Sequence, residues 1–176
     1  MPIFARTKLL IHDYCLYPVP YATFNYSGPN PQKVYEYIKK LFVTVFAVEE
    51  KEIQEREFKW DRVAGEEIFH AQWEIVKDLD TFTFEYMTVS LDGKAKPSKE
   101  FGKEGSIKIR MEGKVRTEYP QETIWQRSLL YEMFRSFYHK VIYDSTRKRY
   151  LEECRVKLGR FGEELRAFLN ILPRMD

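Results

Sequence analysis

The strongest apolar patterns of the chain lie in its last third, between residues 121 and 172. Apolar residues recur there at every third or fourth position, the spacing that places side chains on one face of an α-helix. The first stripe consists of Leu130, Met133, Phe134, Phe137 and Val141. The second follows a heptad spacing and consists of Leu151, Cys154, Leu158, Phe161, Leu165, Phe168 and Leu172. The two stripes predict long C-terminal helices.

Asp144 and Lys148 stand between the two stripes, where apolar residues would be needed to continue the pattern. Fifty continuous helical residues would run about 75 Å, whereas a compact domain of this size has a radius of gyration of about 16 Å. We therefore expect one of two arrangements. Either the helix breaks near Asp144, or its second half projects from the domain and meets a partner.

The first fifty residues predict a strand followed by a helix. Residues 7–17 are rich in β-branched and aromatic side chains and predict a strand that Pro18 and Pro20 interrupt and that resumes over residues 22–26. Asn30 is placed to cap a helix and Pro31 to occupy its first position. Helical spacing then continues in Val34, Ile38, Leu41, Phe42, Val45 and Val48.

The middle of the chain predicts an antiparallel meander. A two-residue turn at Ala64-Gly65 sets Trp60 opposite Phe69, Phe58 opposite Ala71 and Arg56 opposite Trp73. Apolar residues then meet on one face and charged residues on the other, and a slip of one residue would invert both faces.

The second turn of the meander, with Leu79-Asp80 as its loop, sets Ile75 opposite Phe84 and Trp73 opposite Tyr86. Thr88 and Ser90 then continue the inner face, and a β-bulge near Tyr86 or Met87 would be needed to turn Met87, Val89 and Leu91 inward. Residues 92–105 predict a polar loop, and residues 107–117 alternate cleanly enough to predict a half-buried strand.

The fold class that follows is α+β: an antiparallel sheet with one helix in the N-terminal half and long C-terminal helices on one face. The 176 residues, 44% hydrophobic and 32% charged, suit a single domain over 1–176. We divide it into a sheet-plus-helix body, 7–143, and a C-terminal helical extension, 144–176. The net charge of +2 argues against a dedicated DNA-binding domain.

The N-terminus lacks the apolar segment of a signal peptide, and no apolar run reaches the roughly 18 residues of a membrane span. We expect a cytosolic protein, and the abundance of Glu, Lys and Arg with few amides indicates a thermophilic source. Cys15 and Cys154 are isolated and predict neither a disulfide framework nor a zinc site. His12, His70 and His139 are widely separated, so we expect no metal site, no catalytic triad and no cofactor.

The order strand, helix, antiparallel meander and long C-terminal helix resembles that of the helix-grip superfamily, the START-like and Bet v 1-like proteins. The resemblance covers most of residues 7–143 and rests on element order, without a motif. It implies a curved sheet that wraps the last helix around an apolar cavity, and binding or transfer of a small hydrophobic ligand. Some branches are cyclases or aromatases, but the superfamily shares no catalytic residue that could be assigned here.

The predicted ligand site lies on the inner face of the sheet and beneath the first C-terminal stripe. Arg56 beside Trp73 could hold a ligand carboxylate, although an arginine at the start of a strand more often extends into water. The full predicted set is Arg56, Trp60, Trp73, Tyr86, Thr88, Ser90, Phe134 and Phe137. The same aromatic wall is also compatible with a filled core, and no residue is assigned a catalytic role.

The competing interpretation is a structural or interaction protein that forms a homo-oligomer through its heptad stripe. The predicted contact residues are Leu151, Leu158, Phe161, Leu165 and Phe168. Nucleic-acid binding is a minor alternative. Basic residues recur over 94–116 and 147–160, but glutamates interleave them. Gly159 and Gly162 match the spacing of a KH-domain loop, yet small residues in a packed helix explain them better.

Overall fold

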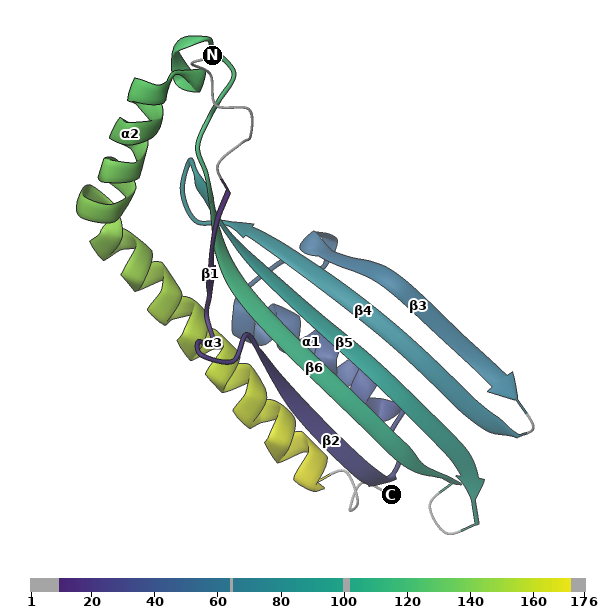
Figure 1. Ribbon diagram of the computed structural model, residues 1–176. Coiled ribbons are helices and arrows are strands. Elements are labelled where there is room, and N and C mark those ends of the chain that lie inside the picture. The colour runs from purple at the N-terminus through teal and green to yellow at the C-terminus, as the bar shows by residue number, and fades with distance from the viewer. Residues whose placement is uncertain (1–9, 64, 100–101, 172–176) are drawn as a thin grey trace.

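In the computed structural model, which describes residues 10–63, 65–99 and 102–171, one antiparallel sheet carries helices on a single face (Figure 1). The strands are β1 (Leu10–Tyr14), β2 (Tyr21–Pro29), β3 (Ile53–Val63), β4 (Glu66–Asp78), β5 (Thr83–Ser98) and β6 (Gly102–Glu118). The helices are α1 (Lys33–Phe46), α2 (Leu129–Phe137) and α3 (Asp144–Ile171). The α+β prediction is confirmed.

The described strands follow the spatial order β1-β6-β5-β4-β3, and β2 also pairs with β6. β1 lies along residues 114–118 of β6, and β2 lies along residues 104–112 of the same edge. The two short strands therefore act as one interrupted edge strand, as the prolines predict. The helix of the N-terminal half begins at Lys33, later than Pro31, because Asn30 takes a left-handed conformation and offers no side-chain cap.

The first hairpin register is confirmed over most of its length: Trp60 lies opposite Phe69, and Phe58 opposite Ala71. The placement of Arg56 is wrong. A β-bulge between Glu55 and Glu57 removes Arg56 from the ladder, so Glu55 faces Trp73. Arg56 instead makes an exposed ion pair with Glu74 at 2.6 Å.

The second register is wrong by three positions, since Ile75 lies opposite Met87 and Trp73 opposite Val89. The turn is longer than Leu79-Asp80, because the backbone N–H groups of both residues donate to the carbonyl of Thr83. An odd shift inverts the faces of the whole strand. Met87, Val89 and Leu91 are therefore buried, whereas Tyr86, Thr88 and Ser90 lie on the outer face.

The predicted polar loop over residues 92–105 is shorter than expected, because β5 extends to Ser98 and β6 begins at Gly102. The two strands stay paired along this entire stretch, from Asp92 opposite Lys108 to Ser98 opposite Gly102. Backbone ladder bonds thus hold a polar hairpin in which few side chains are buried.

The core lies between the sheet and the pair α1 and α3. Phe161 of α3 is fully buried and stacks on Phe42 and Phe46 of α1, with ring centroids 5.8 and 5.4 Å apart. Phe42 in turn meets Trp73 of β4. In the described core this space is filled by large aromatic side chains, which is the filled-core alternative that the sequence left open.

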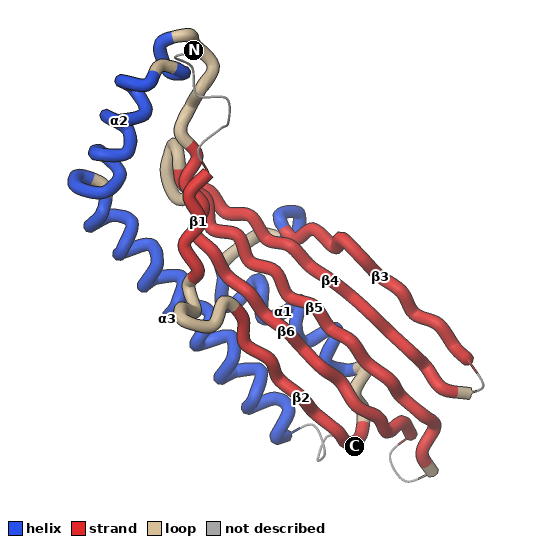
Figure 2. The backbone as a smooth tube through the Cα atoms, in the orientation of Figure 1, coloured by secondary structure: helices blue, strands red, loops and turns tan. Residues whose placement is uncertain are grey.

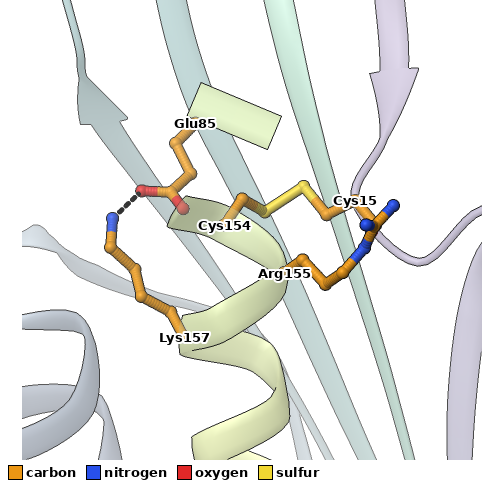
Figure 3. Close-up of a disulfide and its surroundings, with 5 residues drawn as sticks. All are labelled: Cys15, Glu85, Cys154, Arg155 and Lys157. Atoms are coloured by element: carbon orange, nitrogen blue, oxygen red, sulfur yellow. Dashed lines mark hydrogen bonds and ion pairs between the residues drawn. A yellow bond between two sulfur atoms is a disulfide. The ribbon is translucent and has the colours of Figure 1, made fainter. Parts of the chain in front are cut away.

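A disulfide between Cys15 and Cys154 corrects the prediction of two isolated cysteines (Figure 3). The pair is 139 residues apart in sequence but has a Cα–Cα distance of 5.8 Å, so spacing along the chain gives no hint of it. The bond joins the end of the β1 region to α3. Close by, Lys157 of α3 makes an ion pair of 2.7 Å with the buried Glu85 of β5.

The helix break near Asp144 is confirmed. α2 is followed by a π-helical turn, Tyr138–Ile142, and α3 begins at Asp144. α3 lies along the helix-covered side of the sheet, whereas α2 extends beyond the end of the sheet (Figures 1 and 2). The segment that projects is thus α2. We had assigned α3 to a C-terminal extension, but it packs on the sheet as part of the body.

Candidate functional site

The amphipathic helix α2 is turned so that its apolar side faces away from the protein. Nine large apolar side chains on and next to it are 56–76% exposed: Ile124, Trp125, Leu129, Leu130, Met133, Phe134, Phe137, Val141 and Ile142. The side that faces the protein carries Tyr131, Arg135, Tyr138 and His139. Arg135 and His139 are only 2% and 5% exposed. We call the nine residues the α2 apolar face.

Local sequence explains why α2 forms here. Ser128 has an extended backbone, and its hydroxyl accepts a hydrogen bond of 3.2 Å from the backbone N–H of Tyr131, which caps the helix. Leu, Met, Glu and Arg, which favour helices, fill much of α2. These local features favour a helix at this place in the chain, but a helix of nine residues still depends on packing for its stability.

The α2 apolar face is large for a protein surface. An aromatic side chain presents about 150–250 Å², so nine large apolar side chains that are more than half exposed leave on the order of 1,000 Å². The largest apolar patch of an ordinary monomer measures about 300–600 Å². The α2 apolar face exceeds this range.

The opposite side of α2 contains a buried polar cluster around Tyr119, which follows β6. The Tyr119 hydroxyl lies 2.9 Å from Nδ1 of His139. The guanidinium carbon of Arg135 lies 5.9 Å from the ring centre of Tyr119 and 5.9 Å from that of Tyr131. Burial raises the pKa of the Tyr119 phenol to about 12. Burial, with Arg147 nearby, lowers the pKa of His139 below its ordinary value of 6.5.

A groove of about 540 Å³ lies between α1 and the strands β3 and β4, of which β3 is the edge of the sheet. It is lined by Lys39, Lys40, Val43, Thr44, Glu50, Ile53, Glu55 and Trp73. Trp73 is fully buried, and its indole N–H has no hydrogen-bond acceptor among the described residues. On the rim, the Tyr35 hydroxyl donates to Glu55 over 2.7 Å, and burial raises the pKa of that phenol.

The outer face of the sheet, which none of the described helices covers, carries charges of both signs. A shallow groove of about 610 Å³ there is lined by residues of β2, β4, β5 and β6. His70 in this groove lies 2.6 Å from Asp92 and 3.5 Å from Glu57. Lys108 and Lys94 share the groove with Asp92. The mixture of signs does not single out a polyanion.

The structure does not bring the predicted ligand residues together. Trp73 lies in the wall of the groove, and Trp60 is 37% exposed where it stacks on Phe69. Arg56 is at the bulge. Tyr86, Thr88 and Ser90 lie on the outer face of the sheet. Phe134 and Phe137 belong to the exposed α2 apolar face.

The predicted oligomer contact is placed inside the protein. Leu158, Phe161 and Leu165 are fully buried in the core, and Leu151 and Phe168 are partly buried against it. Phe168 stacks on Tyr37 of α1 with ring centroids 3.8 Å apart. A heptad stripe predicts a packed face, but it does not distinguish a partner helix from the chain's own sheet. Leu172, the last member of the stripe, lies outside the described residues.

The site also contains Arg135, which the sequence did not single out, and His139, which was weighed only as a metal ligand or a member of a catalytic triad. They are four positions apart on one helix face, and both contact Tyr119. The signal in the sequence is their position opposite the first apolar stripe. Gly159 and Gly162, weighed as a nucleic-acid loop, lie inside α3, where the Cβ position of Gly162 is 3.0 Å from the Phe24 ring.

In the part of the chain that the structure describes, no group of three or more His, Cys, Asp or Glu side chains is close enough to hold a metal ion. No helix of this part is both long and apolar enough to cross a membrane. The chain matches no protein-family model and no curated protein.

Among solved structures, a delta-endotoxin is similar over 58% of this chain and 63% of its own, with 8% identity and a TM-score of 0.32. The chain thus spans less than two thirds of that protein. A likeness this low gives no argument about fold or function.

Proposed function

We propose that this protein is a self-associating interaction protein in which the α2 apolar face docks against the same face of a second copy. The observation that carries the proposal is the outward orientation of α2. Its apolar side chains are more than half exposed, while Arg135 and His139 are buried on the other side. A helix folded in this way becomes stable in water when its outer side is covered.

The size of the surface fits a pair of identical chains. A standard interface buries about 800 Å² on each partner, close to the area that the α2 apolar face offers. In a two-fold pair the same patch serves both chains. Leu130, Met133, Phe137 and Val141 also step three, four and four residues, the spacing of a seam between two helices.

Charge favours a second copy over an anionic membrane. The ionic side chains around the α2 apolar face are of both signs: Glu122 and Glu132 against Arg127 and Lys140. Amphipathic helices that bind anionic lipid carry an excess of Lys and Arg instead. A nearly balanced set can pair with itself in an antiparallel contact.

Sedimentation velocity over a range of concentrations tests the proposal. We expect a dimer that Phe134→Glu combined with Val141→Glu converts to a monomer. Val156→Glu is the matched control, because Val156 on α3 is 62% exposed and Val141 is 61% exposed. The control variant should remain a dimer.

Three results would contradict self-association through α2. The first is a dimer that persists in the double variant, and the second is a control variant that dissociates equally. The third is a monomeric wild type that co-sediments with phosphatidylcholine vesicles, which would assign the α2 apolar face to lipid.

A second function, binding of a small amphipathic molecule, is favoured by the unpartnered indole N–H of Trp73 in the groove. A buried donor without an acceptor is destabilising, and a ligand oxygen would satisfy it. Val43 and Ile53 offer apolar contacts, while Lys39 and Lys40 could pair with a ligand carboxylate. This is the ligand class that the helix-grip resemblance implies, although the groove lies at the sheet edge and not beneath α3.

Native mass spectrometry followed by denaturing extraction tests this second function. We expect a co-purified mass that Trp73→Phe abolishes, because the variant keeps the ring but loses the N–H donor. Trp60→Phe, outside the groove lining, should retain the bound mass. A wild type that shows the bare chain mass alone contradicts the proposal.

A further inference from the structure

The inward side of α2 holds a charged side chain buried without a counter-charge. Arg135 is 2% exposed, and none of its three guanidinium nitrogens has a hydrogen-bond partner among the described residues. The rings of Tyr119 and Tyr131 lie beside it, with the guanidinium carbon 5.9 Å from the centre of each ring. Two aromatic faces attract a cation but do not accept five N–H bonds. An isolated buried charge is strongly unfavourable unless something pairs with it.

Arg147, at the start of α3, shows how the same fold treats another arginine. Its Nη1 lies 2.9 Å from Asp13, and its Nη2 lies 2.8 Å from Asp144. Asp80 is the carboxylate that influences the pKa of Tyr119. It already accepts hydrogen bonds from the Tyr143 hydroxyl and from the backbone N–H of Phe82. The fold thus supplies two carboxylates to one arginine, and among the described residues it supplies none to Arg135.

Two other buried side-chain nitrogens in the segments around Tyr119 also lack hydrogen-bond partners among the described residues. The Tyr119 phenol stays protonated at neutral pH, and its hydroxyl lies 2.9 Å from Nδ1 of His139. In the tautomer in which the phenol donates to Nδ1, the proton of the neutral imidazole lies on Nε2. That Nε2 is buried and has no partner in the described chain. The side-chain amide nitrogen of Gln121, two residues beyond Tyr119, is likewise buried and unpartnered.

We propose that Arg135, His139 and Gln121 form a binding site for a small oxyanion, a carboxylate or a phosphate, between α2 and the segment that follows β6. The guanidinium fork matches either group with two parallel hydrogen bonds. An ionised carboxylate is acceptor-only, phosphate keeps at least two oxygens that only accept, and either group carries the missing negative charge. Water would accept hydrogen bonds from these donors but would leave the charge uncompensated.

This site is separate from the contact proposed for the α2 apolar face. The two lie on opposite sides of the same helix, so either can exist without the other. The oxyanion would hold α2 to the segment after β6 from the inside and would leave the outer face unchanged.

Thermal unfolding with added inorganic phosphate or acetate, each compared with sodium chloride at equal ionic strength, tests the site. A ligand present at 100 times its dissociation constant should raise the Tm of the wild type by about 5 °C or more. A shift with phosphate alone or with acetate alone identifies which oxyanion class the site takes. Arg135→Met should abolish the shift, and in chloride it should unfold at or above the wild-type Tm because it removes an unpaired charge.

Arg149→Gln is the matched control, because it removes the same charge from an exposed position on α3. It should keep the full shift. If Arg135→Met does not fold, Gln121→Ala provides the second variant and should weaken the affinity roughly 2- to 10-fold, as loss of one hydrogen bond does. The proposal is overturned if neither anion shifts the wild type, or if the variants at Arg135 and Gln121 shift as much as the wild type.

Discussion

α2 and α3 are neighbours along the chain and carry similar apolar stripes, but the stripe of α3 is buried and the stripe of α2 is exposed. In the stripe of α3, Leu158 and Phe161 are 0% exposed. The stripe of α2, around Met133 and Phe134, is 63–64% exposed. The difference shows that helical spacing predicts an apolar face but not what covers it. The sheet covers α3 and ends before it reaches α2 (Figure 1).

The contacts that hold α3 against the sheet have no counterpart in the described part of α2. The disulfide ties α3 to Cys15. Gly113 of β6 has no side chain, and a Cβ there would lie 2.4 Å from Leu158, so its absence lets α3 approach closely. α2 instead turns polar side chains toward the protein. Its stability therefore depends on what meets its two faces, whereas that of α3 is set by packing.

The largest effect should come from truncating the two stripes at equivalent residues. Phe161→Ala removes a ring that stacks on Phe42 and Phe46, and should lower the free energy of unfolding by about 4 kcal/mol. Phe134→Ala, at an exposed position, should change it by less than about 0.5 kcal/mol in dilute solution. Urea denaturation measures both, and equal losses would mean that α2 is packed like α3.

Removal of the disulfide should come next in size. Cys15→Ala with Cys154→Ala should lower the free energy of unfolding by about 3 kcal/mol, the typical contribution of a disulfide. Hydrogen exchange should show faster exchange in α3 and an unchanged rate in α2. The reverse pattern would show that the bond stabilises the projecting helix and not the packed one.

A pair of glycines should give effects of opposite sign. Gly113→Ala places a Cβ against Leu158 and Cys154 and should cost about 2 kcal/mol through overpacking. Gly159→Ala, inside α3 with no atom within 4 Å of the new Cβ, should stabilise the protein by about 0.5–1 kcal/mol. Thermal unfolding compares the two. If Gly113→Ala were harmless, the close approach of α3 to β6 would not matter for stability.

Local pattern was sufficient for the elements of this fold and for the first hairpin, because each depends on neighbours in sequence. The second register could not be obtained in this way. Two hydrogen bonds to the Thr83 carbonyl lengthen the turn, and the resulting shift of three positions exchanges Met87 with Tyr86 on the inner face. The disulfide between residues 139 apart depends on tertiary structure alone.

The candidate sites show the same limit. The apolar stripe of α2 is visible in the sequence, but its outward orientation depends on where the sheet ends. Trp73 was expected at a ligand site, and its unpartnered N–H becomes apparent only when every acceptor around it is known. Arg135 was hidden because an arginine opposite an apolar stripe is normally solvated.

The smallest effect concerns the inward face of α2 and depends on pH. Burial lowers the pKa of His139, so the unfolded chain binds more protons than the folded one just below pH 6.5. Stability should therefore rise with pH up to about 6.5–7 and then level off for this group. His139→Gln should flatten the slope measured by urea denaturation between pH 5.5 and 7.

His12 should contribute to the same slope, because burial, with Arg116 nearby, also lowers its pKa. His12→Gln should remove that contribution. The two variants together should leave a smaller slope in this range than either variant alone. If His139→Gln left the slope as it is in the wild type, the imidazole would be solvated. The inward face of α2 would then be as exposed as its outer face. α2 would differ from α3 simply because neither of its sides is packed.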